Sequence, residues 1–164
     1  MAVDSFTGLV VPVPTADRFV RARGLHARAH VSLLAPFASP EELDPGLLAE
    51  LSRFFGEVTP FDLTLAQLCT FPGGTTYLSP EPSATFRRLT HGLHRLFPEF
   101  PPYGGEFDDV VPHLTVAVDG EDELTLLKRA LPLHTRATRA ELVRGDEQSI
   151  AETLAEFDFG TTAA

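Results

Sequence analysis

The chain of 164 residues carries 13 Lys and Arg against 23 Asp and Glu, a formal net charge of −10, and 43% of its residues are hydrophobic. This composition is typical of a globular protein that buries enough surface to fold without disulfides or metals. The acidic balance excludes an extended surface for long nucleic acid, because such surfaces need an excess of Lys and Arg. The single cysteine, Cys69, excludes a disulfide framework and a thiolate metal cluster.

No apolar run approaches the roughly 20 residues that a membrane-spanning helix needs. Residues 1–15 also lack the basic stretch followed by an apolar stretch that is typical of a secretory signal. We therefore expect a cytoplasmic protein with no membrane partner. Nothing in the sequence demands an oligomer, so we expect a monomer.

The first half of the chain shows strand signals interrupted by proline and one strong helix start. Ser39-Pro40-Glu41-Glu42 has the spacing of a capping box, although Asp44-Pro45-Gly46 can restart the helix one turn later. Gly73-Gly74 separates two stretches with strand periodicity, which predicts a hairpin. In chain order, the predicted elements are a strand at Thr7–Val13, a short helix at Ala16–Arg23 with Thr15 as its N-cap, a strand at Ala29–Leu34, the helix after Ser39, and hairpin strands at Phe61–Leu68 and Thr75–Leu78.

The second half repeats the alternation of helix and strand around one long loop. The stretch Pro98–Pro112 is rich in proline and glycine and has no periodicity, so we expect a loop of a length that is often functional. The other predicted elements are a helix at Ala84–Phe97 with Ser83 as its N-cap, a strand at His113–Val118, a helix at Glu121–Leu131, and strands at Arg136–Arg144 and Ser149–Phe159.

The two halves share one order of elements: a strand that begins at a histidine, then a helix, then two strands. His30 leads the first copy and His113 leads the second, which indicates an internal duplication. We therefore expect a single α+β domain over residues 1–164, built of two similar lobes related by a pseudo-twofold axis. Each lobe is expected to be an antiparallel sheet flanked by outer helices, with a central cleft where the leading strands meet.

Each leading strand carries a His-x-Ser/Thr triplet, His30-Val31-Ser32 in one and His113-Leu114-Thr115 in the other. Because side chains alternate across a strand, the histidine and the hydroxyl residue of each triplet project from the same face. A single triplet is most often an ordinary strand, but two copies that open equivalent units rarely arise by chance. The pattern predicts two imidazoles and two hydroxyls in one cleft.

This set of side chains suits in-line displacement at phosphorus. The reaction needs a base for the attacking hydroxyl or water and an acid for the leaving oxygen, and the histidine pKa near 6.5 serves both at neutral pH. The two hydroxyls can donate hydrogen bonds to the non-bridging phosphate oxygens. The scheme needs no metal or cofactor, and it lets an acidic protein hold a small phosphate.

The stretches HVSLLAPF at His30–Phe37 and PHLTVA at Pro112–Ala117 resemble the paired signatures of the two-histidine phosphoesterases, in the branch of 2′-5′ RNA ligase-like proteins and cyclic phosphodiesterases. The resemblance covers residues 28–118 and includes FDLTL, TYLSP and PPYGG. It implies a bilobal α+β fold and metal-free hydrolysis of 2′,3′-cyclic or 2′,5′-linked phosphodiesters. The implied partner is a small nucleotide or an RNA terminus that carries such a phosphate.

Carried over to this chain, the resemblance makes His30 and His113 the general acid and base and makes Ser32 and Thr115 the phosphate-binding residues. Ser32 stands where threonine is frequent in relatives, so the phosphate is expected to be held less rigidly. The alternative from another functional class is a nucleotide-binding or regulatory module that keeps the cleft and has no turnover. The two intact histidines favour catalysis.

Four further residues are candidates for substrate binding. Arg28 lies two residues before His30, where it can attract phosphate at the cleft mouth. Phe37, Tyr77 and Tyr103 lie beside the motifs or in the long loop, where an aromatic ring can stack on a nucleobase. Packing in the core or in the loop is an equally good reading for each aromatic residue, and a surface role is an equally good reading for Arg28.

Overall fold

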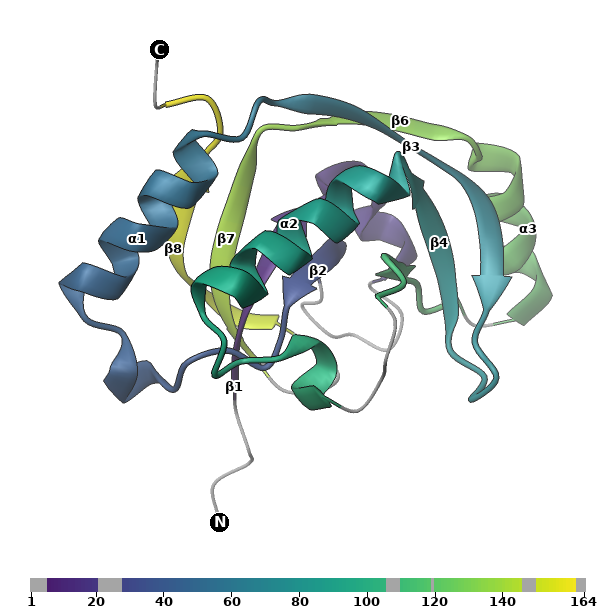
Figure 1. Ribbon diagram of the computed structural model, residues 1–164. Coiled ribbons are helices and arrows are strands. Elements are labelled where there is room, and N and C mark those ends of the chain that lie inside the picture. The colour runs from purple at the N-terminus through teal and green to yellow at the C-terminus, as the bar shows by residue number, and fades with distance from the viewer. Residues whose placement is uncertain (1–5, 21–27, 106–109, 119, 146–149, 162–164) are drawn as a thin grey trace.

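The computed structural model describes residues 6–20, 28–105, 110–118, 120–145 and 150–161. Within these ranges the chain forms two antiparallel sheets of four strands each, in the orders β2-β1-β7-β8 and β5-β4-β3-β6 (Figure 1). The first sheet contains β1 (Phe6–Pro12), β2 (His30–Leu34), β7 (Arg139–Gly145) and β8 (Ile150–Asp158). The second contains β3 (Phe61–Thr70), β4 (Thr76–Glu81), β5 (Leu114–Thr115) and β6 (Leu133–Ala137).

The α-helices lie around the two sheets. They are α1 (Pro45–Gly56), α2 (Ser83–Leu96) and α3 (Gly120–Ala130), and short 3₁₀ helices occupy Pro14–Phe19, Pro40–Glu42 and Pro102–Gly105. Figure 1 shows α1 beside β8 at one end of the molecule and α3 at the opposite end, while α2 crosses between the sheets and contacts β2 and β4. In the described part of the chain, no helix is long and apolar enough to cross a membrane.

The two-lobed α+β architecture is confirmed, but the lobes are not consecutive halves of the sequence. The strands β3 and β4 follow β2 in the chain, yet they pair in the sheet of β5. The strand β7 crosses back and pairs with β1. Each sheet therefore has its histidine-bearing segment at one edge, and the two edge strands β2 and β5 contact each other. One continuous cluster of buried apolar side chains joins both sheets.

The helix starts differ from two of the predicted caps. Pro14 opens the first 3₁₀ helix with Val13 at the cap position, and Pro82 occupies the cap of α2 in place of Ser83. A predicted end of the first helix at Arg23 lies outside the described residues. The capping box at Ser39 does form, but it closes only one 3₁₀ turn. The α-helix α1 starts after Asp44, whose carboxylate accepts a hydrogen bond from the Leu47 amide at 2.8 Å, so the later of the two expected starts is the observed one.

Two predicted strands also differ from the structure. The strand expected at Arg136–Arg144 is two strands, because β6 ends at Ala137 and β7 begins at Arg139 in the other sheet. The strand expected at His113–Val118 is reduced to Leu114–Thr115. Beyond it, the Ala117 amide leaves the sheet and donates to the carbonyl oxygen of Phe19 at 2.9 Å, which ends the pairing with β4.

Candidate functional site

A pocket of about 400 Å³ lies where β2 and β5 meet. His30, Ser32, His113 and Thr115 all line this pocket, so the structure brings together the four side chains of the two triplets. Of the other sequence candidates, Arg28 and Tyr103 also line it. Among the described residues that line the pocket there is no Asp or Glu, and Arg28 is the only arginine or lysine. The described part of this wall is therefore without carboxylates in an acidic protein, which suits an anionic ligand.

Strand geometry explains how β2 presents its two polar side chains. Val31 is fully buried in the core, and its neighbours His30 and Ser32 project from the opposite face into the pocket. Ser32 pairs with Val10 on β1, and His30 pairs with Pro12. Val10 also lines the pocket, so β1 forms its floor beside the two β2 side chains.

The two histidine rings are oriented by equivalent backbone hydrogen bonds. Nδ1 of His30 lies 2.8 Å from the carbonyl oxygen of Arg28, and Nδ1 of His113 lies 2.8 Å from the carbonyl oxygen of Val111. A carbonyl oxygen can only accept, so Nδ1 of each ring is the donor. In the neutral ring, Nε2 then carries the lone pair, which can take a proton from a reacting group.

The charge state of His30 is biased by its surroundings. Burial of the ring lowers its pKa from the usual value of 6.5, and nearby positive charge on His113 and Arg28 lowers it further. The hydrogen bond to the Arg28 carbonyl and the negative charge of Glu141 oppose this effect without reversing it. His30 therefore remains neutral to a lower pH than a free imidazole does.

His113 lies among aromatic rings. The ring centroid of Phe71 is 5.1 Å from that of His113 in an edge-to-face arrangement, and the ring of Tyr77 is at 5.8 Å. Tyr103 lies 6.4 Å away with its ring inclined by 26°. Its hydroxyl donates to the Val111 carbonyl oxygen at 3.2 Å, the same oxygen that holds His113. The two histidines thus have different environments, aromatic at one and charged at the other.

The remaining aromatic candidates differ in their access to the pocket. Tyr77 is directly opposite Thr115 in the β4–β5 pairing and stacks on Phe71 at 4.1 Å, but it does not line the pocket itself. Phe37 is 5% exposed, and its ring packs against Phe97 and Phe100. Phe37 is therefore a core residue, and we do not carry it into the proposed site.

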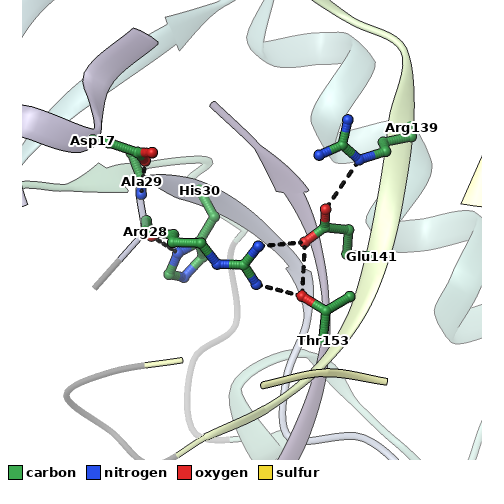
Figure 2. Close-up of polar contacts among 7 residues, drawn as sticks. All are labelled: Asp17, Arg28, Ala29, His30, Arg139, Glu141 and Thr153. Carbon is green, nitrogen blue, oxygen red and sulfur yellow. Dashed lines mark hydrogen bonds and ion pairs between the residues drawn. The ribbon is translucent and has the colours of Figure 1, made fainter. Parts of the chain in front are cut away.

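Arg28 belongs to a charged network that Figure 2 shows. Its Nη1 lies 3.4 Å from Oε1 of Glu141, and its Nη2 donates to Oγ1 of Thr153. The other oxygen of Glu141 accepts from Nε of Arg139 at 3.0 Å. Glu141 is 1% exposed and is the only charged residue that is buried among those described.

Sequence reasoning missed Glu141 and Phe71. Glu141 did carry a signal, because it is a lone carboxylate between Ala140 and Leu142-Val143 in a predicted strand. Its contact partners could not be predicted from the sequence, because Arg28 and Thr153 come from distant parts of the chain. Phe71 lies in the hairpin turn next to Gly73-Gly74, where composition alone does not indicate a site.

Within the described ranges, no group of three or more His, Cys, Asp or Glu side chains is placed so that it could hold a metal ion.

Comparison with known proteins shows which family this chain resembles in sequence and which structures it resembles in fold. Residues 13–149 match the 2′-5′ RNA ligase superfamily. The fold is similar to that of TT0787 of Thermus thermophilus, with a TM-score of 0.63 and 22% sequence identity over 96% of this chain and 99% of that one. It is also similar to E. coli LigT in its complexes with NADP+ (TM-score 0.58, 16% identity) and with 3′-AMP (TM-score 0.57, 15% identity), each over 96% of this chain and 99% of LigT. No curated protein matches the sequence.

These structural likenesses, all at low identity, establish the fold, while the family match spans most of the chain. It includes both His-x-Ser/Thr triplets, which the structure places in one pocket. The resemblance drawn from those triplets is confirmed. The chain belongs to the 2′-5′ RNA ligase superfamily of two-histidine phosphoesterases.

Proposed function

We propose that this chain is a phosphodiesterase that acts on 2′,3′-cyclic phosphates or 2′,5′-linked phosphodiesters of small nucleotides or RNA ends, as a cytoplasmic monomer and without a metal. The observation that carries this proposal is the matched orientation of the two histidines. Each ring donates through Nδ1 to a backbone carbonyl, and both rings line one pocket with two hydroxyl side chains. General acid and base catalysis needs two such nitrogens on opposite sides of a phosphorus atom.

In the hydrolytic direction, Nε2 of one neutral histidine takes a proton from water as the water oxygen forms a bond to phosphorus. The bond from phosphorus to one ribose oxygen breaks, and the other histidine, protonated at Nε2, gives its proton to that oxygen. From a 2′,3′-cyclic phosphate the product is a ribose monophosphate with a free neighbouring hydroxyl, whereas a 2′,5′ linkage gives two fragments, one with the phosphate and one with the freed hydroxyl. In this proposal the hydroxyls of Ser32 and Thr115, which line the same pocket, donate hydrogen bonds to the non-bridging oxygens and stabilise their negative charge.

Two further observations support a small nucleotide as the substrate. The pocket wall has no carboxylate among its described residues, although the whole chain has a net charge of −10. Among proteins with this fold, E. coli LigT has been solved in complex with 3′-AMP and with NADP+, which are both small nucleotides.

The test is hydrolysis of the four nucleoside 2′,3′-cyclic monophosphates in excess EDTA. We expect turnover by the wild-type protein and a rate lower by about 10² to 10⁴-fold in His30→Ala and in His113→Ala, the loss expected for a missing general acid or base. His91→Ala is the matched control, because His91 is exposed on α2 and lines no part of the pocket. Wild-type rates in both site variants would exclude the mechanism. Binding of these nucleotides without turnover would instead indicate a nucleotide-binding module.

A further inference from the structure

The network around Glu141 meets the pocket at Arg28, which lines it together with His30, and Figure 2 shows both residues. Arg28 lies two residues before His30, and Ser32 lies two residues after it, so Arg28 and Ser32 are on opposite sides of the histidine along the strand. Ser32 is one of the residues placed to hold the reacting phosphate. The backbone positions of Arg28 and Ser32 are thus about four extended residues apart along the chain, each about 3.3 Å.

The side chain of Arg28 runs back along the sheet, because its partner Glu141 pairs with Val10, the residue that also pairs with Ser32, and the guanidinium is therefore level with Ser32 but about two strand spacings of 4.8 Å to one side of it. Its guanidinium bonds to Glu141 on β7 and to Thr153 on β8, and the order of the sheet is β2-β1-β7-β8. The side chain therefore reaches across β1, away from the edge where β2 meets β5 and His113. The separation is therefore lateral: the Arg28 cation lies over the β1–β7 side of β2, and His113 lies beyond the other edge of β2.

The charges of this network leave the Arg28 guanidinium able to bind an anionic ligand. Within the described residues, one carboxylate, Glu141, is shared by two guanidinium groups, Arg28 and Arg139, so the ion pairs of this network contain one more positive than negative charge. Glu141 is 1% exposed, whereas the Arg28 side chain is 41% exposed and lines the pocket. A guanidinium has five N–H donors, so its contacts with Glu141 and Thr153 hold it in place and leave donors for a ligand.

We infer that Arg28 binds a second phosphate group of the substrate, carried by the same nucleotide as the phosphate that lies between the histidines. This inference rests on the proposed function. It narrows the substrate class to nucleotides with a cyclic or 2′,5′-linked phosphate and a further phosphate, such as one at the 5′ position. Glu141 is a positioning residue in this scheme, because it fixes the guanidinium without touching the ligand.

The test compares two product-like ligands by calorimetry, so it does not depend on turnover. The probes are adenosine 2′-phosphate and adenosine 2′,5′-bisphosphate, with the uridine pair as a second set. We expect the wild-type protein to bind the bisphosphate about tenfold more tightly, as expected for hydrogen bonds to a charged group. In Arg28→Gln and Glu141→Gln, the ratio of the two dissociation constants should fall toward one.

Two matched controls separate this effect from a general change of charge. Arg144→Gln removes an arginine that is 44% exposed and pairs with Glu152 at 3.7 Å. Arg144 alternates with the pocket residues Val143 and Gly145 and therefore lies on the other face of the sheet. Glu152→Gln removes the exposed carboxylate that pairs with Arg144 on that same other face of the sheet. Both control variants should keep the wild-type ratio.

The outcomes distinguish the inference from the proposed function. Equal affinity of the wild-type protein for the two ligands, or a wild-type ratio in Arg28→Gln, would overturn the inference alone. Loss of both ligands by the same factor in Arg28→Gln would place Arg28 at the reacting phosphate and would also overturn it. If the wild-type protein bound no ligand of either set, the proposed function and the inference would fall together. If Glu141→Gln does not fold, the ratio of dissociation constants in Arg28→Gln alone decides the test.

Discussion

His30 and His113 make the same hydrogen bond from different sheets: in each, Nδ1 lies 2.8 Å from the carbonyl oxygen of the residue two positions earlier. The backbone of the two acceptors is itself held in place. The amide of Ala29, next to Arg28, donates to Asp17 at 2.8 Å, and the Val111 carbonyl also accepts from Tyr103. Each ring is therefore oriented by the local chain and not by the other histidine, so the site is preorganised before a ligand binds.

This arrangement predicts the tautomer of both rings. At alkaline pH, long-range ¹H–¹⁵N spectra should show His30 and His113 protonated on Nδ1, because only that nitrogen faces a carbonyl acceptor. The exposed His91 serves as the internal reference and should show no such fixed preference. Protonation of either site ring on Nε2 would contradict the assignment of its catalytic nitrogen.

The lowered pKa of His30 predicts how the stability of the protein depends on pH. Burial keeps the folded-state pKa below the usual 6.5, so the unfolded chain binds an extra proton at pH values between the two. The contribution of neutral His30 to the free energy of unfolding is therefore fully present above pH 6.5 and is lost as the pH falls through the folded-state pKa. We expect the drop in unfolding free energy from about pH 7.5 to about pH 5 to be smaller in His30→Gln than in the wild type.

Urea denaturation at the two pH values measures this difference, and direct titration of the His30 ring signals measures the pKa itself. His91→Gln is the control, since it also removes one histidine but from an exposed helix surface. An equal drop in the wild type and in His30→Gln would show that the buried ring does not contribute to the acid sensitivity.

Local features of the sequence predict well which side chains of the two triplets face the pocket. The alternation of His30, Val31 and Ser32 depends only on strand geometry, and the structure places both outer side chains in the pocket. The contacts of Arg28 could not be predicted, because Thr153 is 125 residues away in the sequence. Phe37 shows the same limit, since its position beside the motif gives no sign that Phe97 and Phe100 cover its ring.

The exchange of strands between the two sheets could not be predicted from the sequence either. Residues on either side of Thr138 have similar strand character, so the pattern predicts one strand and cannot show that the chain leaves one sheet there and enters the other. Pairing of β7 with β1 is a long-range choice that depends on how both sheets pack. The order of the elements could be predicted from the sequence, whereas their assembly into two sheets could not.

Glu141 is expected to matter for stability as well as for ligand binding. Replacing it with glutamine removes the negative charge that two arginines share and weakens the contacts with Arg28 and Arg139. We expect Glu141→Gln to lower the free energy of unfolding by about 1–3 kcal/mol, the cost of disrupting hydrogen bonds at a buried polar group. Glu156→Gln, at the exposed position across the strand pair, should change it by less than about 0.5 kcal/mol. Equal effects of the two variants in urea denaturation would show that the buried network contributes nothing specific.

Tyr103 provides a test of base stacking beside His113. Tyr103 lines the pocket, and a stacked base is worth about 1–3 kcal/mol, so Tyr103→Leu should weaken binding of adenosine 2′-phosphate by about 5- to 150-fold. Tyr103→Phe keeps the ring and should bind close to wild type, although it loses the hydroxyl bond to Val111. Residue 103 has a φ of 55°, in the left-handed region, so leucine and phenylalanine must both adopt the same unfavourable backbone conformation. The abasic analogue methyl riboside 2-phosphate is the control ligand, and calorimetry should give it the same affinity for the two variants. If Tyr103→Leu weakened the abasic ligand as much as the nucleotide, the ring would be supporting the loop and not the base.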